Sequence, residues 1–292
     1  MNTSDTPTAR VLIIAGSDSS GGAGIQADIK ACAAFGAYSM TAVTAVTAQN
    51  TLGVHKVDLM SPDMVRAQIE ACVSDIGVDV IKLGMLGSEA IIRTVYELIE
   101  PLDATVVLDP VMVATSGDRL LEEGAVAAMK ELLVPIADLV TPNVPEAEIL
   151  TGLSITDTDD LAKAGETILA MGSYAALMKG GHLDMTSVVD VLVSEDGASV
   201  MTGPRIHSRH THGTGCTLAS AVAAALALGA NLDEAVSSAR DYVFEAIRTA
   251  PKLGGGSGPL NHGLAVPQGS ADGDDPDPDP ANPFAALKGL SS

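Results

Sequence analysis

The stretch HTHGTGCTLASAVAAALALG, residues 210–229, joins a glycine-broken polar turn to an alanine-rich segment. Gly213 and Gly215 permit backbone angles and close approaches that a side chain would block, and the run 217–228 has strong helix propensity. The turn therefore lies at a helix N-terminus, where unpaired amides and the helix dipole favour an anion. A thiol there tends to have a lowered pKa, so Cys216 is a candidate base or nucleophile. Alternatively, Gly-Thr-Gly is an ordinary N-capping turn and Cys216 a small buried residue.

Upstream of this turn, short β-rich apolar runs alternate with segments of helical pattern. Strands are predicted at 10–15, 40–49, 79–83, 105–108, 138–141 and 175–178, and helices at 23–35, 62–75, 88–99, 120–133 and 161–171. This alternation predicts right-handed βαβ crossovers and an α/β fold with a mainly parallel sheet. The runs 188–194 and 198–203 are expected to form an antiparallel pair. Helices at about 214–228 and 233–249 complete the folded part.

The composition fits such a fold and excludes several classes of partner. Hydrophobic residues make up 47% of the 292 positions and aromatic residues only 2%, so aliphatic side chains must fill the interior, as in parallel sheets covered on both faces. The 16 basic and 37 acidic residues give a formal charge of −21, which argues against binding to nucleic acid or an anionic membrane. An anionic substrate would need local compensation from helix ends, lysine or a metal ion.

Cysteine usage and the N-terminal sequence indicate an intracellular protein. Cys32, Cys72 and Cys216 are far apart and odd in number, so no disulfide framework is expected. The first residues lack a basic segment followed by a long apolar one, and no stretch is apolar enough to span a bilayer. A cytoplasmic location is therefore expected.

The chain is expected to divide into three parts. Residues 1–9 form an N-terminal extension, 10–263 a single folded domain, and 264–292 an acidic tail rich in Pro and Asp. The tail has too few apolar residues to bury a core, so it is expected to be disordered.

The first glycine loop, GSDSSGGAGIQAD at 16–28, contains a match to the relaxed dinucleotide fingerprint GxGxxA, starting at Gly22. Five residues separate Gly16 from Gly22, and no acidic residue follows at the ribose-binding distance, so a dehydrogenase is disfavoured. A P-loop is also absent, because Lys179 precedes its glycines in KGGH instead of following them.

Several polar residues lie where predicted strands end. In TPNVPEAEIL, residues 141–150, Asn143 and Glu146 are spaced to face one site and suit Mg²⁺, although the same pair would also form a capping box. Asp109 ends the strand 105–108, where α/β sheets bind ligands, but lone aspartates there also form turns. A structural metal on three nearby histidines is disfavoured, since no Cys or carboxylate completes the set of His207, His210 and His212.

Taken together, these stretches resemble the hydroxymethylpyrimidine/phosphomethylpyrimidine kinases of thiamine biosynthesis, within the ribokinase-like superfamily. The similarity covers about residues 10–263, in AGSDSSGGAGIQADIKACAAFGAY, TAVTAQNTLGV, KLGMLGS, VLDPVMVATSGDRLL, LVTPNVPEAEILTG, ALMKGGHL, THGTGCTLASA and GSGPLNH. It implies a three-layer αβα fold, ATP and Mg²⁺ as cofactors, a homodimer, and two successive phosphorylations. These convert 4-amino-5-hydroxymethyl-2-methylpyrimidine to its monophosphate and then to its diphosphate.

The resemblance also implies roles for individual residues. The turn Gly213, Thr214 and Gly215 is expected to act as an anion hole, with Cys216 as general base. The pyrimidine pocket is expected to contain Gln49, whose amide can pair with an aminopyrimidine edge, together with Gly16, Asp28, Met85 and Val111. Lys179 and Asn143 are assigned to the nucleotide, Glu146 and Asp109 to the metal. The loop 113–121 is expected to act as a lid.

Two other functions remain open from the sequence. The first is a pyridoxine or pyridoxal kinase, because some relatives with a GTGC turn phosphorylate a pyridine ring, and Gln49 and Met85 discriminate only partly. The second is a non-catalytic nucleotide or pyrimidine sensor on the same scaffold. Cys216 and the pair Asn143 and Glu146 argue against a sensor, which needs no base.

Overall fold

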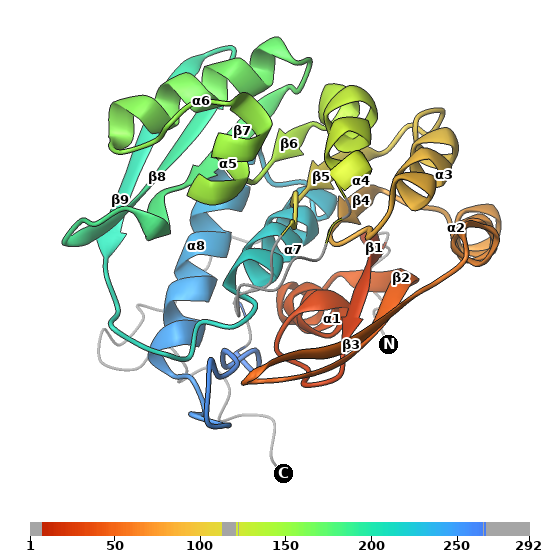
Figure 1. Ribbon diagram of the computed structural model, residues 1–292, viewed down its shortest axis with the longest axis horizontal. Helices are drawn as coiled ribbons and strands as arrows, with labels where there is room; N and C mark the ends of the chain where they lie inside the picture. Colours follow the sequence, from red (N-terminus) through yellow and green to blue (C-terminus); the bar gives the residue numbers. More distant parts are fainter. Residues whose placement is uncertain (1–7, 113–120, 122, 265, 267–292) are drawn as a thin grey trace, which may run out of the picture.

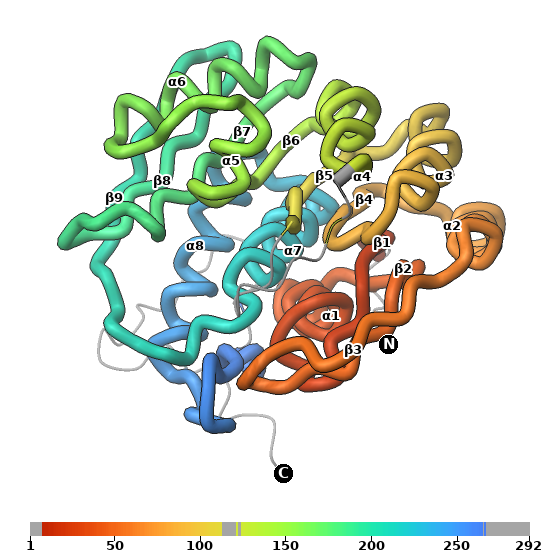
Figure 2. The backbone as a smooth tube through the Cα atoms, viewed as in Figure 1, coloured from red at the N-terminus to blue at the C-terminus, as the bar shows by residue number. Residues whose placement is uncertain are grey.

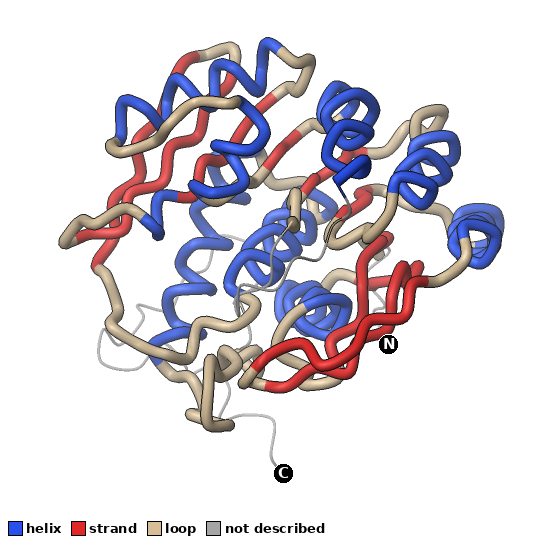
Figure 3. Tube along the Cα trace, viewed as in Figure 1, coloured by secondary structure: helices blue, strands red, loops and turns tan. Residues whose placement is uncertain are grey.

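The computed structural model describes residues 8–112, 121, 123–264 and 266, and within them a nine-stranded sheet crosses the molecule (Figure 3). The strands are β1 (Arg10–Asp18), β2 (Tyr38–Asn50), β3 (Gly53–Leu59), β4 (Val80–Leu83), β5 (Thr105–Leu108), β6 (Leu139–Val140), β7 (Ala175–Lys179), β8 (Ser187–Ser194) and β9 (Gly197–Pro204). The α-helices are α1 (Gly24–Phe35), α2 (Pro62–Asp75), α3 (Glu89–Ile99), α4 (Glu123–Ala128), α5 (Val144–Thr151), α6 (Thr158–Ala170), α7 (Thr214–Ala227) and α8 (Leu232–Arg248).

The sheet has the order β3-β2-β1-β4-β5-β6-β7-β8-β9. Its six central strands, β2-β1-β4-β5-β6-β7 in that order, all pair in parallel. This confirms the predicted mainly parallel sheet. The runs 188–194 and 198–203 do form an antiparallel hairpin, which closes at Ser194 and Gly197. Strand β3 was not predicted; it is a mostly exposed edge strand, antiparallel to β2, and carries no buried apolar pattern.

Helices cover both faces of the sheet, with α1, α7 and α8 on one face and α2 to α6 on the other (Figure 1). Alternate residues of β1 show this directly, since Val11 and Ile13 belong to one core while Leu12 and Ile14 belong to the second. A strand buried on both faces is therefore apolar throughout, which is the pattern that marked β1 in the sequence. The expected three-layer αβα architecture is confirmed.

Most helices begin where capping signals place them. Helix α2 matches the predicted range, because the Ser61 side chain accepts from the Met64 amide and Pro62 occupies the first turn. The predicted helix 120–133 differs: α4 passes into a π-helical turn, Met129–Leu133, and a 3₁₀ turn, Val134–Ile136.

Some of the expected features lie outside the described residues. The loop 113–121, expected to act as a lid, is described only at Leu121, and the tail 264–292 only at 264 and 266. In the part of the chain that is described, no helix is both long and apolar enough to cross a membrane.

The segment after α8 returns to the N-terminal half of the chain. Its Ser257 amide donates to the Thr51 carbonyl at the β2–β3 turn, so the blue and orange segments of Figure 2 lie side by side there. The Gly258 carbonyl accepts from the His212 amide. The turn before α7 is thus held between the first strands and the last described segment.

One ion pair lies fully buried between the sheet and one helical layer. Lys82 on β4 places its Nζ 3.0 Å from both carboxylate oxygens of Asp28 on α1, and neither side chain is exposed. Ser220 on α7 donates to the same carboxylate at 2.7 Å. The pair therefore connects β4, α1 and α7.

Replacing Asp28 by alanine leaves the Lys82 ammonium buried without a counter-charge. We expect the Asp28→Ala variant to lose about 3–5 kcal/mol of unfolding free energy, measured by urea denaturation. Asp58→Ala is the matched control, since it breaks the solvent-exposed pair with Lys56 and should change stability little. Equal, small effects of the two substitutions would contradict the structural importance of the buried pair.

Candidate active site

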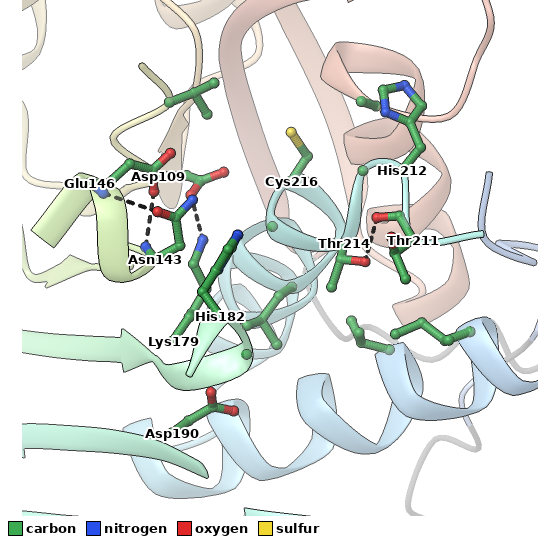
Figure 4. A pocket seen from close by; sticks show the side chains of 18 of the residues that line it. Asp109, Asn143, Glu146, Lys179, His182, Asp190, Thr211, His212, Thr214 and Cys216 are labelled. Atoms are coloured by element: carbon green, nitrogen blue, oxygen red, sulfur yellow. Dashed lines mark hydrogen bonds and ion pairs between the residues drawn. The ribbon is translucent and has the colours of Figure 1, made fainter. Parts of the chain in front are cut away.

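A cavity of about 860 Å³ lies at the carboxyl ends of the central strands, facing the N-terminus of α7 (Figure 4). This is the edge at which open α/β sheets bind ligands. All of the site residues proposed from the sequence line it except Asp28: Gly16, Gln49, Met85, Asp109, Val111, Asn143, Glu146, Lys179, Gly213, Thr214, Gly215 and Cys216. The structure thus brings together residues spread over two hundred positions of the chain.

The turn that begins α7 requires glycine at its first position. Gly213 has a φ of +83°, a backbone conformation that residues with a side chain rarely adopt. A Cβ built there would also lie 1.8 Å from the Gly22 carbonyl oxygen, so the backbone angle and the lack of space each exclude a side chain. Thr214 donates through its hydroxyl to the Thr211 carbonyl at 2.7 Å (Figure 4). The positive end of the α7 dipole therefore faces the cavity in a fixed orientation, which suits an anion.

A histidine from the last described segment supports this turn. Thr217 donates to the Gly213 carbonyl at 2.8 Å, and its Oγ1 lies 2.9 Å from His262 Nε2. Burial, with the charges of Lys30 and His212, lowers the pKa of His262 to about 4. The imidazole is therefore neutral at physiological pH, and its Nε2–H donates to Thr217, whose own proton is already used.

Cys216 stands at the cavity wall in the first turn of α7, but its pKa differs from the expectation. Burial raises the pKa of the thiol to about 12, and the nearby Asp28 and Asp109 carboxylates act in the same direction, while Lys82 opposes them. The expected lowering by the helix N-terminus is therefore outweighed in the free protein. The residue is correctly located, but it carries its proton at neutral pH.

Lys179, at the end of β7, and Asp109, at the end of β5, form an ion pair at 3.0 Å on the cavity floor (Figure 4). Thr141 also contacts the Asp109 carboxylate, at 3.3 Å. Burial alone would lower the pKa of Lys179, but Asp109 and Glu146 raise it, so the side chain is a cation. A Cβ on Gly215 would lie 3.1 Å from Lys179 Nζ, so the glycine lets the pair approach the helix.

Asn143 and Glu146 form the capping box that the sequence offered as one interpretation, and both also face the cavity. They form a capping box at the start of α5, with Glu146 N donating to Asn143 Oδ1 at 3.0 Å and Asn143 N donating to Glu146 Oε2 at 2.9 Å (Figure 4). Both also line the cavity. Burial raises the pKa of Glu146 to about 7; Lys179 opposes this shift and Asp109 adds to it.

Two carboxylates of the cavity wall, Asp109 and Glu146, supply the type of donor that a divalent cation prefers. Asp109 and Glu146 supply hard oxygen donors, and a cation between them would offset the burial that raises the pKa of Glu146. No three His, Cys, Asp or Glu side chains gather into a metal-binding group in the described residues, so phosphate oxygens or waters would complete the coordination. The histidine cluster does not form, since His212 instead pairs with Asp18 at 2.8 Å.

Asp28 requires a correction. Its side chain is fully buried beneath the cavity and its carboxylate is occupied by Lys82 and Ser220, so it is not placed to touch a substrate. Lys82 lines the cavity in its stead and was missed. A lysine within the apolar strand VIKL was the available signal, because a charge inside a buried strand needs a specific partner.

The architecture and site define a class of protein: an αβα phosphotransferase of the ribokinase-like fold, with a glycine turn at a helix N-terminus facing lysines and carboxylates. The sequence matches the family described as phosphomethylpyrimidine kinase over residues 18–261. The chain belongs to this family.

Individual relatives and solved structures are similar to this chain over most of its length. The thiamine biosynthesis bifunctional protein ThiED of Geobacter sulfurreducens is 49% identical, over 89% of this chain and 53% of the relative, so the chain spans about half of that protein. The hydroxymethylpyrimidine/phosphomethylpyrimidine kinase of Streptomyces coelicolor is 47% identical, over 88% of this chain and 95% of its own. A solved pyridoxal kinase from Staphylococcus aureus, in complex with AMP-PCP and pyridoxal, superimposes with a TM-score of 0.81, 37% identity, and coverage of 88% and 95%.

The strained turn gives a test with a matched control. In the Gly213→Ala variant the new methyl group meets the Gly22 backbone, so we expect the turn to shift and kcat to fall by about 100-fold, as when an oxyanion donor is lost. Gly229→Ala also places alanine at positive φ, +91°, but with open space around it. It should lose stability and keep kcat. Equal kcat values in the two variants would contradict a role for the turn geometry.

Proposed function

We propose that this protein transfers a phosphoryl group from ATP to 4-amino-5-hydroxymethyl-2-methylpyrimidine, and then to the resulting monophosphate, in thiamine biosynthesis. The observation that best supports this proposal is that one cavity joins three sets of groups. They are Gln49 at one end, the Gly213–Cys216 turn in the middle, and Lys179 with Asp109 beyond it. Each set suits one part of the reaction, namely the ring, the transferred phosphoryl group and the nucleotide phosphates. The curated relatives support the same substrate.

Phosphoryl transfer requires positioning and charge neutralisation more than covalent chemistry. The N-terminus of α7 stabilises negative charge on the phosphoryl group. Lys179 neutralises charge on the nucleotide phosphates, and Asn143 binds them by donating hydrogen bonds from its side-chain amide. Mg²⁺, held by Glu146 and Asp109, would supply further positive charge when bound. The remaining cavity wall, which includes His182 and Phe244, accommodates the base of the nucleotide.

Cys216 is the proposed general base for the substrate hydroxyl. Because the pKa of its thiol is about 12 in the free protein, the proton leaves Cys216 only when positive charge accumulates around it. Lys82 is the group of this chain whose charge lowers that pKa. To act as the base, Cys216 would first have to release its own proton to solvent, and a divalent cation held by Asp109 and Glu146 would favour that step by adding positive charge.

The proposal includes the wider setting of the enzyme. Residues 10–263 form the kinase domain, between an extension at 1–9 and the acidic tail at 264–292. The enzyme acts in the cytoplasm as a homodimer. Its free cysteines, Cys32, Cys72 and Cys216, suit a reducing compartment.

Pyridoxal phosphorylation is the second candidate, because the Staphylococcus aureus pyridoxal kinase has the same fold. The pyrimidine is favoured because the curated relatives that the chain matches over most of its length are pyrimidine kinases. The family description, phosphomethylpyrimidine kinase, favours an enzyme over the sensor hypothesis.

Product identification tests the proposal. The purified protein is incubated with Mg²⁺-ATP and the hydroxymethylpyrimidine, beside a pyridoxal reaction, and the products are identified by mass. We expect the pyrimidine monophosphate followed by the diphosphate. Pyridoxal phosphate alone would assign the enzyme to vitamin B6 salvage, and no product from either substrate would refute both.

Removal of the base gives a sharper test of mechanism. Cys216→Ala should lower kcat by about 10²–10⁴-fold with little change in KM, because a general base contributes that much to proton transfer. Cys72→Ala is the control, since Cys72 is a half-buried thiol on α2 outside the cavity. Full turnover by Cys216→Ala would contradict the assignment.

A further inference from the structure

The loop between β7 and β8, residues 180–186, borders the cavity at the end away from Gln49. Gly181 and His182 of this loop line the cavity, as does Phe244 on α8. Strands β7, β8 and β9 lie at the opposite end of the sheet from β2, which carries Gln49 (Figure 1). The loop therefore adjoins the part of the cavity that the proposed function assigns to the nucleotide.

Packing against the core does little to order this loop. Among residues 181–186 only Leu183 is buried, and the other five are exposed. The backbone makes two short-range hydrogen bonds, from Leu183 N to the Gly180 carbonyl at 3.0 Å and from Met185 N to the Leu183 carbonyl at 2.9 Å. A segment with so few buried apolar contacts opens easily unless other groups hold it.

One arginine supplies contacts along the whole loop. Arg205 directly follows β9, which pairs with the start of β8, so its side chain reaches the loop from the neighbouring strand. Its Nε donates to the Met185 carbonyl and its Nη1 to the Gly181 carbonyl, both at 2.9 Å. Its Nη2 donates to the carbonyls of Leu183 at 3.0 Å and Ser187 at 3.4 Å. A single planar group thus holds the carbonyls of four alternate residues.

A buried ion pair fixes the start of the same loop, next to Lys179 (Figure 4). Asp190 on β8 accepts from the Gly180 amide at 3.0 Å through one carboxylate oxygen, and from Arg240 Nε on α8 at 2.9 Å through the other. Gly180 also packs closely on β8, since a Cβ there would lie 1.9 Å from the Val189 carbonyl oxygen. The peptide that follows Lys179 is therefore held in one position.

We propose that Arg205 and Asp190 are positioning residues for the nucleotide, which hold the loop 180–186 in its cavity-lining shape before ATP binds. If ATP had to order the loop itself, that cost would reduce its affinity, whereas a loop held in advance avoids the cost. Arg205 acts on the backbone rather than on the phosphates, because hydrogen bonds to loop carbonyls occupy most of its five N–H groups. The inference rests on the proposed kinase function, since it takes ATP as the occupant of this end.

The test separates the shape of the arginine side chain from its charge. Arg205→Ala removes all of its hydrogen bonds, and Arg205→Lys keeps the positive charge without the planar fork that spans the carbonyls. Arg93→Ala is the matched control, because Arg93 is an exposed arginine on α3 that pairs with Glu89 outside the cavity. The measurements are kcat, KM for ATP and for the pyrimidine, the Kd of the ATP analogue AMP-PCP by calorimetry, and the unfolding free energy.

We expect KM for ATP and the Kd of AMP-PCP to rise by about tenfold in both Arg205 variants, since the loop is no longer ordered in advance in either. KM for the pyrimidine should stay unchanged, because the ring binds at the other end of the cavity. Arg93→Ala should behave as the wild type. A merely structural role would reduce the folded fraction, which lowers the apparent kcat and leaves KM for ATP as it was.

The outcomes distinguish this inference from the function on which it rests. A wild type that binds AMP-PCP but phosphorylates no pyrimidine refutes the proposed function, and the Kd values of the variants still decide the inference. A wild type that binds no AMP-PCP overturns both. A wild-type Kd in Arg205→Ala, or its restoration in Arg205→Lys, overturns the inference alone, because the fork would then be unnecessary.

A second variant covers the case in which Arg205→Ala does not fold. Asp190→Asn leaves one acceptor oxygen to serve both Gly180 and Arg240, so the start of the loop loses one of its two contacts. The Kd of AMP-PCP is again expected to rise while KM for the pyrimidine stays unchanged. An unchanged Kd in a folded Asp190→Asn variant would overturn the inference.

Discussion

The buried ion pair between Lys82 and Asp28 is the interaction on which the site depends. Burying two charges costs several kcal/mol per ion unless their geometry and hydrogen bonds compensate, and here both carboxylate oxygens contact the ammonium while Ser220 donates to one of them. The pair fixes β4, α1 and α7 relative to one another. It also places a positive charge beneath Cys216, at the position where the site must handle anions.

The buried charges around the cavity are acidic on balance, which would favour the binding of a further cation. Lys82 and Lys179 are the cations of the buried group, against the carboxylates of Asp28, Asp109 and Glu146. Burial, assisted by this excess of acid, raises the pKa of Glu146 to about 7 and that of the Cys216 thiol to about 12, so the thiol stays protonated. In a chain of net charge −21, an anionic ligand requires local positive charge, which Lys82, Lys179 and the N-terminus of α7 supply around this cavity.

The sequence was sufficient for the architecture because hydrophobic periodicity and caps are local. Apolar strands buried on both faces, and signals such as Ser61 before Pro62, predicted most elements to within a few residues. Pairings between residues remote in the sequence were not predictable. Strand β3 has no apolar pattern, so its pairing with β2 left no signal. Asp28 was predicted to line the substrate pocket, whereas the structure pairs it with Lys82, 54 positions away. The prediction of a lowered pKa for Cys216 was wrong for the same reason. Burial raises this pKa, and so do Asp28 and Asp109, which are remote in the sequence but near in space.

The sequence offered a structural and a functional interpretation of the same residues as alternatives, but a residue that caps a helix can also face the cavity. Asn143 and Glu146 form a capping box and still line the cavity, because each keeps polar capacity beyond the atoms that bond the backbone. A side chain that must meet a ligand in one orientation has to be held in that orientation beforehand, since ordering it on binding costs affinity. Hydrogen bonds that look merely structural are therefore what a selective site requires of its neighbours.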